Sequence, residues 1–150
     1  MHRKDFIKSC GVLCLGGSAL ATFLQSCGTV SYVAQSVFSE NKISIKKSEF
    51  IEMNPDKPGE KTTERKYILV KTEKLEFPVC IYKQNENEYT ALYMECTHRG
   101  CELKPNAGYL VCPCHGSEFS NKGIVQNPPA ENNLKQFQIT ADNENIYILL

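Results

Sequence analysis

The chain of 150 residues contains no tryptophan, no internal repeat and only three histidines, His2, His98 and His115. So few histidines leave room for no more than one metal site that uses two of them. The formal net charge is zero, with 17 basic and 17 acidic residues, so the composition gives no reason to expect nucleic acid as a partner. The length allows a single domain with a core of moderate size.

Long helical patterns are also missing, since no helical period is sustained after residue 41. Short runs with the composition of β-strands occur instead, at residues 43–45, 67–70, 78–82, 89–93, 109–111, 137–139 and 146–149. Polar stretches at 83–88 and 142–145 each separate two such runs and predict two hairpins. Two prolines and a glycine at 54–59 exclude regular structure there. The sequence therefore predicts a small antiparallel β-domain.

Cysteine, by contrast, is abundant, with eight residues that fall into three groups. Cys10, Cys14 and Cys27 lie in an apolar N-terminal region, and Cys80 stands alone in a predicted strand, where a small buried side chain is expected. The other four belong to two short boxes that also contain two of the histidines. A count alone would indicate a disulfide scaffold, whereas this distribution points to a metal site.

The boxes read Cys96-Thr97-His98-Arg99-Gly100-Cys101 and Cys112-Pro113-Cys114-His115-Gly116-Ser117. Each supplies one thiolate and one imidazole, as Cys-x-His and as Cys-x-x-His, and each has a further cysteine. Thiolates and imidazoles bind iron–sulfur clusters as well as structural zinc. The residue types leave both metals open, although a zinc site would not need the further pair of cysteines.

The two boxes resemble the ligand loops of Rieske iron–sulfur proteins, and the resemblance extends over about residues 66–150. It implies an all-β fold, a Rieske-type antiparallel β-sandwich in which two loops form a small cluster-binding subdomain. It also implies one [2Fe-2S] cluster per chain. The ligands would be two cysteines on one iron and two histidines on the other, namely Cys96, Cys112, His98 and His115.

The second cysteine of each box matches the disulfide that marks the cytochrome-bc-like members of the family, so Cys101 and Cys114 are expected to be bonded. Free thiols, or thiols that join a zinc site, are the alternative. Ser117 matches a serine whose hydroxyl donates to a bridging sulfide of the cluster. Gly100 and Gly116 are expected to provide unusual backbone angles or close approach.

Two positions depart from the pattern of respiratory members. Phe119 stands where many high-potential members have a tyrosine that donates to a ligand sulfur, so a reduction potential below the top of the family's range is expected. Arg99 replaces an apolar residue beside the quinol pocket, which argues against quinol oxidation and suits an acidic protein partner. The segment Asn127-Pro128-Pro129-Ala130, followed by Leu134, resembles the family's third, proline-containing loop.

The N-terminus has the features of an export signal. Basic residues precede an apolar run from about residue 10 to residue 24, and the start resembles a twin-arginine signal in which Lys4 follows Arg3. Leu24-Gln25-Ser26-Cys27 resembles the lipobox of bacterial lipoproteins, which implies cleavage before Cys27 and lipidation of its thiol. The predicted domains are a signal peptide at 1–26, the lipidated cysteine and a tether at 27–41, and a Rieske domain at 42–150. An uncleaved membrane helix and a soluble exported protein are the alternatives.

The sequence thus predicts a membrane-anchored lipoprotein on the periplasmic side of a bacterial cell envelope, which transfers electrons through one Rieske cluster. It would act as a mobile carrier or as the small subunit of an oxidoreductase, with a redox protein or a membrane oxidoreductase complex as partner. The iron–sulfur subunit of a quinol-oxidising cytochrome bc-type complex is the alternative, and a structural zinc module is a third hypothesis. A catalytic Rieske oxygenase is excluded, because no histidine remains for its mononuclear iron.

Overall fold

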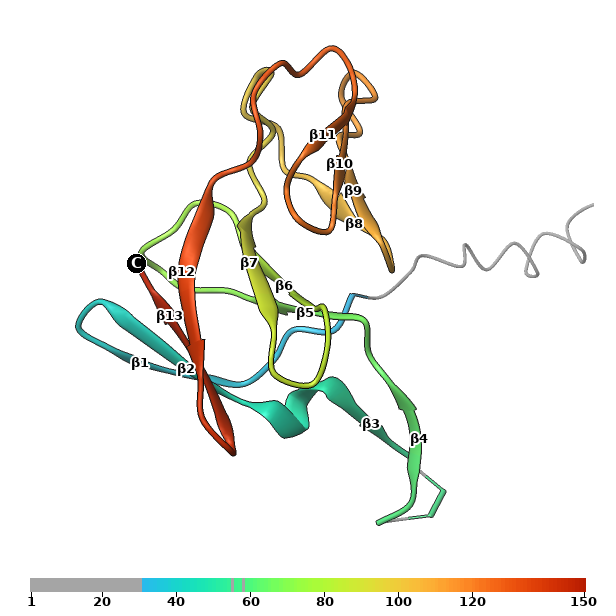
Figure 1. The fold of residues 1–150 in the computed structure, drawn as a ribbon, viewed down its shortest axis with the longest axis vertical. Coiled ribbons are helices and arrows are strands. Elements are labelled where there is room, and N and C mark those ends of the chain that lie inside the picture. The colour runs from blue at the N-terminus through green and yellow to red at the C-terminus, as the bar shows by residue number, and fades with distance from the viewer. Residues whose placement is uncertain (1–30, 55, 58) are drawn as a thin grey trace, which may run out of the picture. The chain divides into compact units, whose positions relative to one another are not determined.

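The structure, a computed structural model, describes residues 31–54, 56, 57 and 59–150 (Figure 1). Within these ranges the sole helical element is a short 3₁₀ turn, η3 (Lys47–Phe50), and all other regular structure is β-strand, as predicted. No helix in the described ranges has the length and the apolar character that crossing a membrane requires. The strands are β1 (Ser36–Ser39), β2 (Lys42–Lys46), β3 (Ile51–Met53), β4 (Lys61–Glu64), β5 (Tyr67–Val70), β6 (Val79–Lys83), β7 (Tyr89–Tyr93), β8 (Lys104–Pro105), β9 (Tyr109–Val111), β10 (Glu118–Ser120), β11 (Val125–Asn127), β12 (Gln136–Ala141) and β13 (Asn145–Leu149).

Seven of these strands form one antiparallel sheet in the order β1-β2-β13-β12-β7-β6-β5. Both hairpins expected from the polar stretches are present: β6 pairs with β7, with Ile81 opposite Ala91, and β12 pairs with β13, with Ile139 opposite Ile148. These strands alternate apolar side chains with a period of two, which places one set on the same face of the sheet. We call this seven-stranded sheet the base, because the other described strands are attached to it.

The first described segment, residues 31–39, differs from the expected tether. Val33 forms a parallel bridge with Leu69 of β5, where the N–H of Ala34 donates to Leu69 O at 2.8 Å and the N–H of Leu69 donates to Tyr32 O at 2.9 Å. A few residues later, β1 pairs with β2 at the other end of the strand order. We call residues 31–39 the strap, because they pair with β5 at one edge of the sheet and form β1 at the other edge. Residues 31–39 therefore belong to the same compact unit as the rest of the described residues, Ser31–Leu150.

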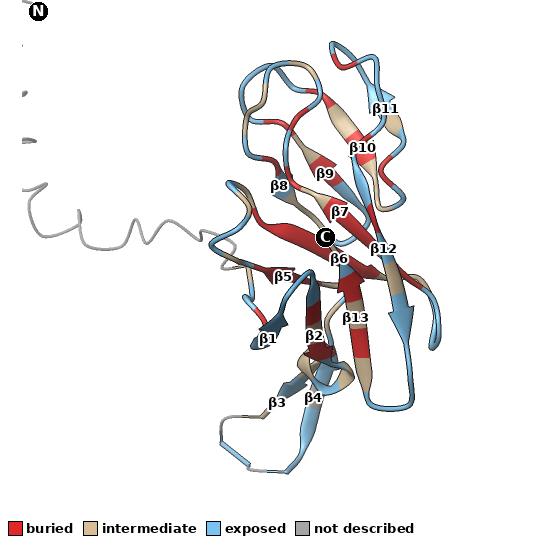
Figure 2. Cartoon of the chain, turned by 90° about the vertical axis from the view of Figure 1, so that its left-hand side faces the viewer, coloured by how far each residue is buried: buried red, intermediate tan, exposed pale blue. Residues whose placement is uncertain are grey.

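The strands on either side of the proline-containing stretch are described. The stretch connects β3 and β4, which pair with each other as a separate two-stranded sheet. At the described residues of this connection, 54, 56, 57, 59 and 60, no regular structure is present, as the sequence predicts, but the sequence does not reveal the two short strands on either side. This hairpin extends away from the seven-stranded sheet (Figure 2).

Buried side chains form two cores that share strand β6. Val79 and Ile81 belong to the first core, inside the seven-stranded sheet, whereas Cys80 and Tyr82 point to the opposite face and belong to the second. Figure 2 shows that β6 is buried along nearly its whole length. Because successive side chains of a strand point to opposite faces, burial of both sets means that both faces of the sheet are covered here. The prediction that Cys80 is buried is confirmed.

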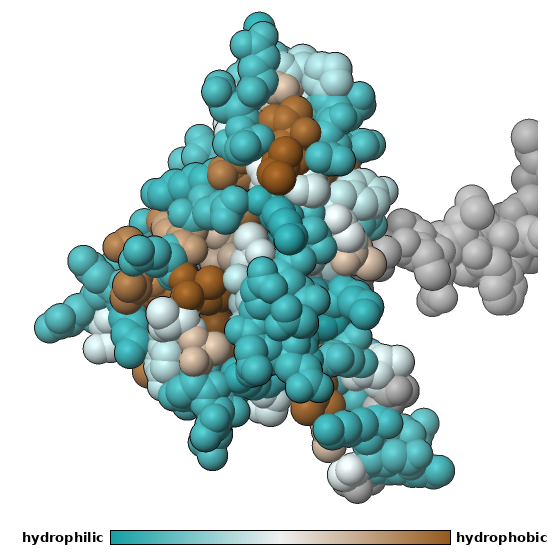
Figure 3. All heavy atoms as spheres, viewed as in Figure 1, coloured by the Kyte–Doolittle hydropathy of each residue, from teal (hydrophilic) through white to brown (hydrophobic). Residues whose placement is uncertain are grey.

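A second, four-stranded sheet, β11-β10-β9-β8, covers the outer face of β6 and contributes to the second core. It lies at the top of Figure 1 and is made from residues that leave the base after β7 and return to it at β12. The two boxes lie in its loops. On the face seen in Figure 3 the surface is mainly hydrophilic, and hydrophobic side chains form separate small patches.

Candidate metal centre

The two boxes form loops with the same backbone hydrogen bonds. In loop 1, residues 96–101, the N–H of Cys96 donates to Cys101 O at 2.9 Å and the N–H of Gly100 donates to Cys96 O at 2.8 Å. In loop 2, residues 112–117, the N–H of Cys112 donates to Ser117 O at 2.8 Å and the N–H of Gly116 donates to Cys112 O at 3.0 Å. The fifth residue of each loop is a glycine with φ of +70° and +81°, respectively, where a side chain would be strained. The first cysteine of each loop therefore occupies an equivalent position.

Both of these first cysteines are buried free thiols, with 2% of Cys96 and 1% of Cys112 exposed. Burial raises the pKa of the Cys96 thiol, and hydrogen bonds from the backbone N–H groups of His98 and Arg99 oppose this rise. Without a metal, burial keeps such a thiol protonated. A bound metal ion replaces the proton and stabilises the thiolate. The two thiols have the chemistry of metal ligands.

The histidines of the two loops lie against each other. The ring centroids of His98 and His115 are 5.0 Å apart, and the rings are nearly perpendicular. Nδ1 of His98 is buried and has no hydrogen-bond partner among the described residues. Buried nitrogen atoms without a partner are rare in folded proteins, and coordination to a metal is one explanation for such an atom. His115 is exposed to solvent.

The second cysteines of the loops form the predicted disulfide, Cys101–Cys114. Their sulfur atoms and that of Cys112 all lie within 4.8 Å of one another. A disulfide sulfur carries no thiolate, so of these three atoms only the Cys112 sulfur can bind a metal. The disulfide joins loop 1 to loop 2 next to that sulfur and fixes the spacing between the loops.

A third loop, residues 127–134, packs on the other two. The N–H of Ala130 donates to Ser117 Oγ at 2.9 Å, and the hydroxyl of Thr97 donates to Asn132 O at 2.6 Å. Ser117 is fully buried, and because its oxygen accepts from Ala130, its own O–H proton remains available to another acceptor. The sequence resemblance identified the third loop, but the contribution of Thr97 was missed, since nothing in the boxes shows its partner.

Comparison with known proteins agrees with this geometry. The sequence model of the Rieske [2Fe-2S] domain family matches residues 53–138, more than half of the chain. The chain belongs to the Rieske [2Fe-2S] domain family. Its cofactor is a Rieske-type [2Fe-2S] cluster, and the two buried thiols and the unpartnered Nδ1 of His98 suit the donor set that such a cluster needs.

Two of the similar proteins are cytochrome b6-f complex iron-sulfur subunits. The chain is 40% identical over 55 residues to the cytochrome b6-f complex iron-sulfur subunit of Prochlorococcus marinus (strain MIT 9303), over 35% of this chain and 31% of that protein. It is 42% identical over 53 residues to the corresponding subunit of Synechococcus sp. (strain JA-3-3Ab), over 34% and 31% of the two chains. The match thus spans about a third of each relative.

Solved structures cover more of the Rieske domain. The plasma membrane Rieske protein PetC3 from Synechocystis PCC 6803 is 31% identical, with a TM-score of 0.51, and the match covers 57% of this chain and 87% of that one. A naphthalene 1,2-dioxygenase with indole bound is 23% identical, with a TM-score of 0.53, over 75% of this chain and 26% of that one. The second likeness concerns the fold alone.

The two departures from the family pattern lie in different surroundings. Phe119 of β10 is fully buried in the second core, opposite Leu110 of β9, so the Rieske domain has no hydroxyl at this position. Arg99 is exposed in loop 1, directly after His98. Cys27 and the rest of residues 1–30 lie outside the described residues.

One residue that holds the Rieske subdomain to the base was not singled out by the sequence. The hydroxyl of Tyr82 on β6 is shared between the carbonyl oxygens of Asn106 and Tyr109, each at 2.8 Å, in the turn between β8 and β9. Burial raises the pKa of Tyr82 well above its ordinary value, so the hydroxyl stays protonated and donates. A tyrosine in a strand gives no sign of such a partner.

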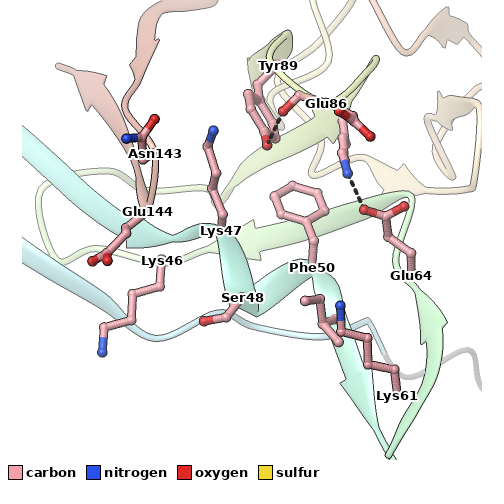
Figure 4. Close-up of a pocket in the computed structure, with 12 residues that line it drawn as sticks. Lys46, Lys47, Ser48, Phe50, Lys61, Glu64, Glu86, Tyr89, Asn143 and Glu144 are labelled. Carbon is pink, nitrogen blue, oxygen red and sulfur yellow. Dashed lines mark hydrogen bonds and ion pairs between the residues drawn. The ribbon is translucent and has the colours of Figure 1, made fainter.

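A cavity of about 560 Å³ lies away from the ligand loops, between η3, the β3–β4 hairpin and the turn between β12 and β13 (Figure 4). Phe50 and Tyr89 pack together beside it, and Lys83 is paired with Glu64. Its lining contains neither cysteine nor histidine, so it offers no ligand of the Rieske type. This cavity is therefore separate from the candidate metal centre.

Proposed function

We propose that this Rieske protein is a membrane-tethered, extracytoplasmic electron carrier. In this proposal the thiolates of Cys96 and Cys112 bind one iron of the cluster, and the imidazoles of His98 and His115 bind the other. The observation that carries the assignment is the set of two buried free thiols and a buried, unpartnered Nδ1 in two loops of equivalent geometry. The disulfide and the third loop hold these loops together.

A bound Rieske cluster supplies one-electron chemistry at a potential between roughly −150 and +300 mV. The chain's own residues decide how that electron is exchanged. The exposed ring of His115 provides the route to a partner, while buried Cys96 and Cys112 stay out of contact with water. The Ser117 hydroxyl, whose oxygen already accepts from Ala130, would donate its proton to a sulfide of the bound cluster and would favour the reduced, more negative state. The absence of a hydroxyl at Phe119 lowers the potential in comparison with members that have tyrosine.

The partner in this proposal is a protein with an acidic docking face. Arg99 is exposed and directly follows His98 in loop 1, where a positive charge would attract carboxylates and steer association. Docking of this kind weakens as salt is added, because exposed charges are screened. Reduction of the full chain by an acidic redox partner should therefore slow at high ionic strength, and Arg99→Ala should reduce that dependence.

The tether in this proposal is a lipid on Cys27, which places the domain on the periplasmic side. It is supported by the Leu24–Cys27 motif and by the similarity to a plasma membrane Rieske protein. The test is a Cys27→Ala variant of the full chain expressed in bacteria. The native protein should be found in the membrane fraction and the variant should not be processed. Equal processing of both would contradict lipidation.

The decisive experiment is electron paramagnetic resonance of the dithionite-reduced full chain, with metal analysis. A rhombic signal with a low average g and about two irons per chain are expected. Cys112→Ser and His115→Ala should abolish the signal. Cys80→Ala, which removes a buried thiol outside the loops, is the matched control and should retain it. A colourless protein with one zinc ion would refute the assignment.

The named relatives favour a second candidate, a subunit of a quinol-oxidising complex, since several are cytochrome b6-f complex iron-sulfur subunits. Arg99 and Phe119 argue against this candidate, because both depart from the pattern of respiratory members. Stopped-flow mixing of the oxidised full chain with a short-chain plastoquinol distinguishes the two proposals. Rapid reduction of the cluster, accelerated in Arg99→Leu, would favour the quinol-oxidising role.

A further inference from the structure

Three sulfur atoms lie together at the point where the two ligand loops are joined. Those of Cys101, Cys112 and Cys114 are all within 4.8 Å of one another. Two of them form the disulfide Cys101–Cys114, and the third belongs to a free thiol. A thiolate beside a disulfide can undergo thiol–disulfide exchange, in which it attacks one sulfur of the disulfide and displaces the other. The free cysteine and the disulfide are therefore reactants placed side by side.

The arrangement favours attack on one sulfur of the disulfide over the other. Attack of Cys112 on Cys101 links loop 2 to loop 1, and the two sulfur atoms need to approach by at most about 2.8 Å to reach the S–S bond length. The displaced sulfur is then that of Cys114, which is exposed to solvent. Attack on Cys114 would instead close a small ring across Pro113, whose fixed φ restricts such a ring.

Burial favours the same direction. Only 1% of Cys112 is exposed, whereas Cys114 is open to solvent. The exchange buries a disulfide, which has no polar hydrogen, and moves the free thiol to a position where water can hydrate it. The displaced side chain also has room, because a hollow of about 560 Å³ is lined by Cys101 and Cys114 together with Phe77 and Pro113.

We propose that Cys112 attacks the Cys101–Cys114 disulfide whenever its thiolate is not bound to iron, an inference that rests on the proposed cluster. Cys112 gives its proton to water and forms a bond to Cys101 Sγ. The bond between Cys101 and Cys114 breaks, and Cys114 leaves as a thiolate that takes up a proton. No oxidant or reductant is consumed, because one disulfide replaces another. A Cys112 thiolate that holds iron is not free to attack, so the loaded chain keeps its native pairing.

The exchange removes a cluster ligand and creates a surface thiol. Once Cys112 is part of a disulfide it cannot bind iron, and the free thiol of Cys114 stands exposed directly before His115. The metal-free chain with a closed disulfide thus inactivates its own site. Loading and disulfide closure are coupled in consequence, since iron must be held by Cys112 when the disulfide closes.

Differential labelling of the full chain tests the exchange. The loaded chain is first examined by paramagnetic resonance, and a portion is then freed of iron with a chelator in the absence of oxygen. Both samples are incubated for hours, the timescale of uncatalysed disulfide rearrangement, and quenched with acid. Free thiols are blocked with one reagent in denaturant, and the disulfide is then reduced and its cysteines are blocked with a second. Mass spectrometry reads which label each cysteine carries.

The second label marks the disulfide, and its position decides the matter. It should be on Cys101 and Cys114 in the loaded chain, and it should move from Cys114 to Cys112 after iron is removed. Dithiothreitol, which is oxidised while Cys101–Cys112 becomes two thiols, should restore the uptake of iron and sulfide. Retention of the second label on Cys114 in the iron-free chain would overturn the proposal.

Two ligand variants separate the attacking residue from the loss of the cluster. Cys96→Ser and Cys112→Ser each remove a buried thiol, but among the described residues the Cys96 sulfur is not part of the group of three. Cys96→Ser should still transfer the second label to Cys112, whereas Cys112→Ser should keep it on Cys101 and Cys114. Loss of the label from Cys114 in Cys112→Ser would assign the attack to another thiol and contradict the proposal. Should either variant fail to fold, the native iron-free chain decides.

Failure of the proposed function has a different signature. Absence of the rhombic signal before the chelator is added would refute the cluster, and the labels in the metal-free chain would still show whether Cys112 attacks. A rhombic signal at the start, followed by unchanged labels after iron is removed, would overturn the exchange alone.

Discussion

The hydroxyl of Ser117 is predicted to make two hydrogen bonds, one with the N–H of Ala130 and one with the cluster. The variant Ser117→Ala removes both, and thermal stability reports on the first while the reduction potential reports on the second. In the structure the hydroxyl accepts from the N–H of Ala130 at 2.9 Å and is fully buried, with its proton directed to no described acceptor. In the holoprotein we expect that proton to be donated to the cluster. Ser117→Ala removes both bonds without adding volume. The variant should therefore be less stable and have a lower reduction potential.

The magnitudes follow from the two bonds. A buried N–H left without its acceptor costs about 1–3 kcal/mol. For a body of the size of residues 31–150 the unfolding entropy is about 250 cal/mol/K, so Tm should fall by roughly 4–12 °C. A hydrogen bond that favours the reduced cluster by about 0.5–1.5 kcal/mol corresponds to a potential lower by roughly 20–65 mV.

The assay is a redox titration of the full chain followed by paramagnetic resonance, with thermal unfolding followed by circular dichroism. Ser120→Ala is the control: its hydroxyl accepts from the N–H groups of Lys122 and Ile124 in the β10–β11 turn, at 3.3 and 3.2 Å. It should lower Tm slightly and leave the potential unchanged. If Ser117→Ala lowers Tm but keeps the native potential, the hydroxyl has only a structural role and the reasoning is wrong.

Three further predictions concern other sites. Phe119→Tyr should raise the potential in the same titration by roughly 20–65 mV, and an unchanged value would show that the new hydroxyl reaches no ligand sulfur. Serine at both Cys101 and Cys114 removes a link between residues 13 apart and should lower the unfolding free energy by about 3 kcal/mol in urea denaturation, a loss that an unchanged midpoint would rule out. A hydrogen bond from Tyr147 holds the pKa of Asp142 at about 2, below the usual 3.8, so this stabilisation is complete above pH about 4 and is lost toward pH 2. Native Tm should fall more than that of Asp142→Asn over this window, and parallel curves would contradict the assignment.

Local patterns predicted the hairpins but not the closure of the sheet. The pairing of Ile81 with Ala91 follows from two apolar runs around a polar turn, which are close in sequence. The strap could not be predicted in this way, because Val33 pairs with Leu69 and its surroundings depend on which sheet edges are open. The β3–β4 pair was not predicted, because its strands are short and the prolines between them indicate a loop.

The same distinction between local and tertiary features applies to the candidate metal centre. The proposed ligands, namely Cys96, Cys112 and the histidines of the two loops, were predicted from their residue types and from the resemblance of the two boxes to Rieske ligand loops. The third loop's attachment through Thr97 and the bond of Tyr82 to the β8–β9 turn depend on tertiary neighbours. Neither residue has a chemistry that distinguishes it from ordinary surface or core positions.

The junction at which residues 94–135 leave and rejoin the base is narrow. The N–H of Tyr93 donates to Lys135 O at 2.9 Å, and Leu92 stands opposite Gln136, so exit and entry lie on adjacent strands. Such an arrangement makes the redox part an exchangeable cassette, since a tight turn or a different module could connect β7 to β12 without rearranging the base. Any replacement would have to cover the apolar face left by Cys80, Tyr82 and Leu92. Changes that alter electron transfer can then be confined to residues 94–135 without changing the seven-stranded sheet.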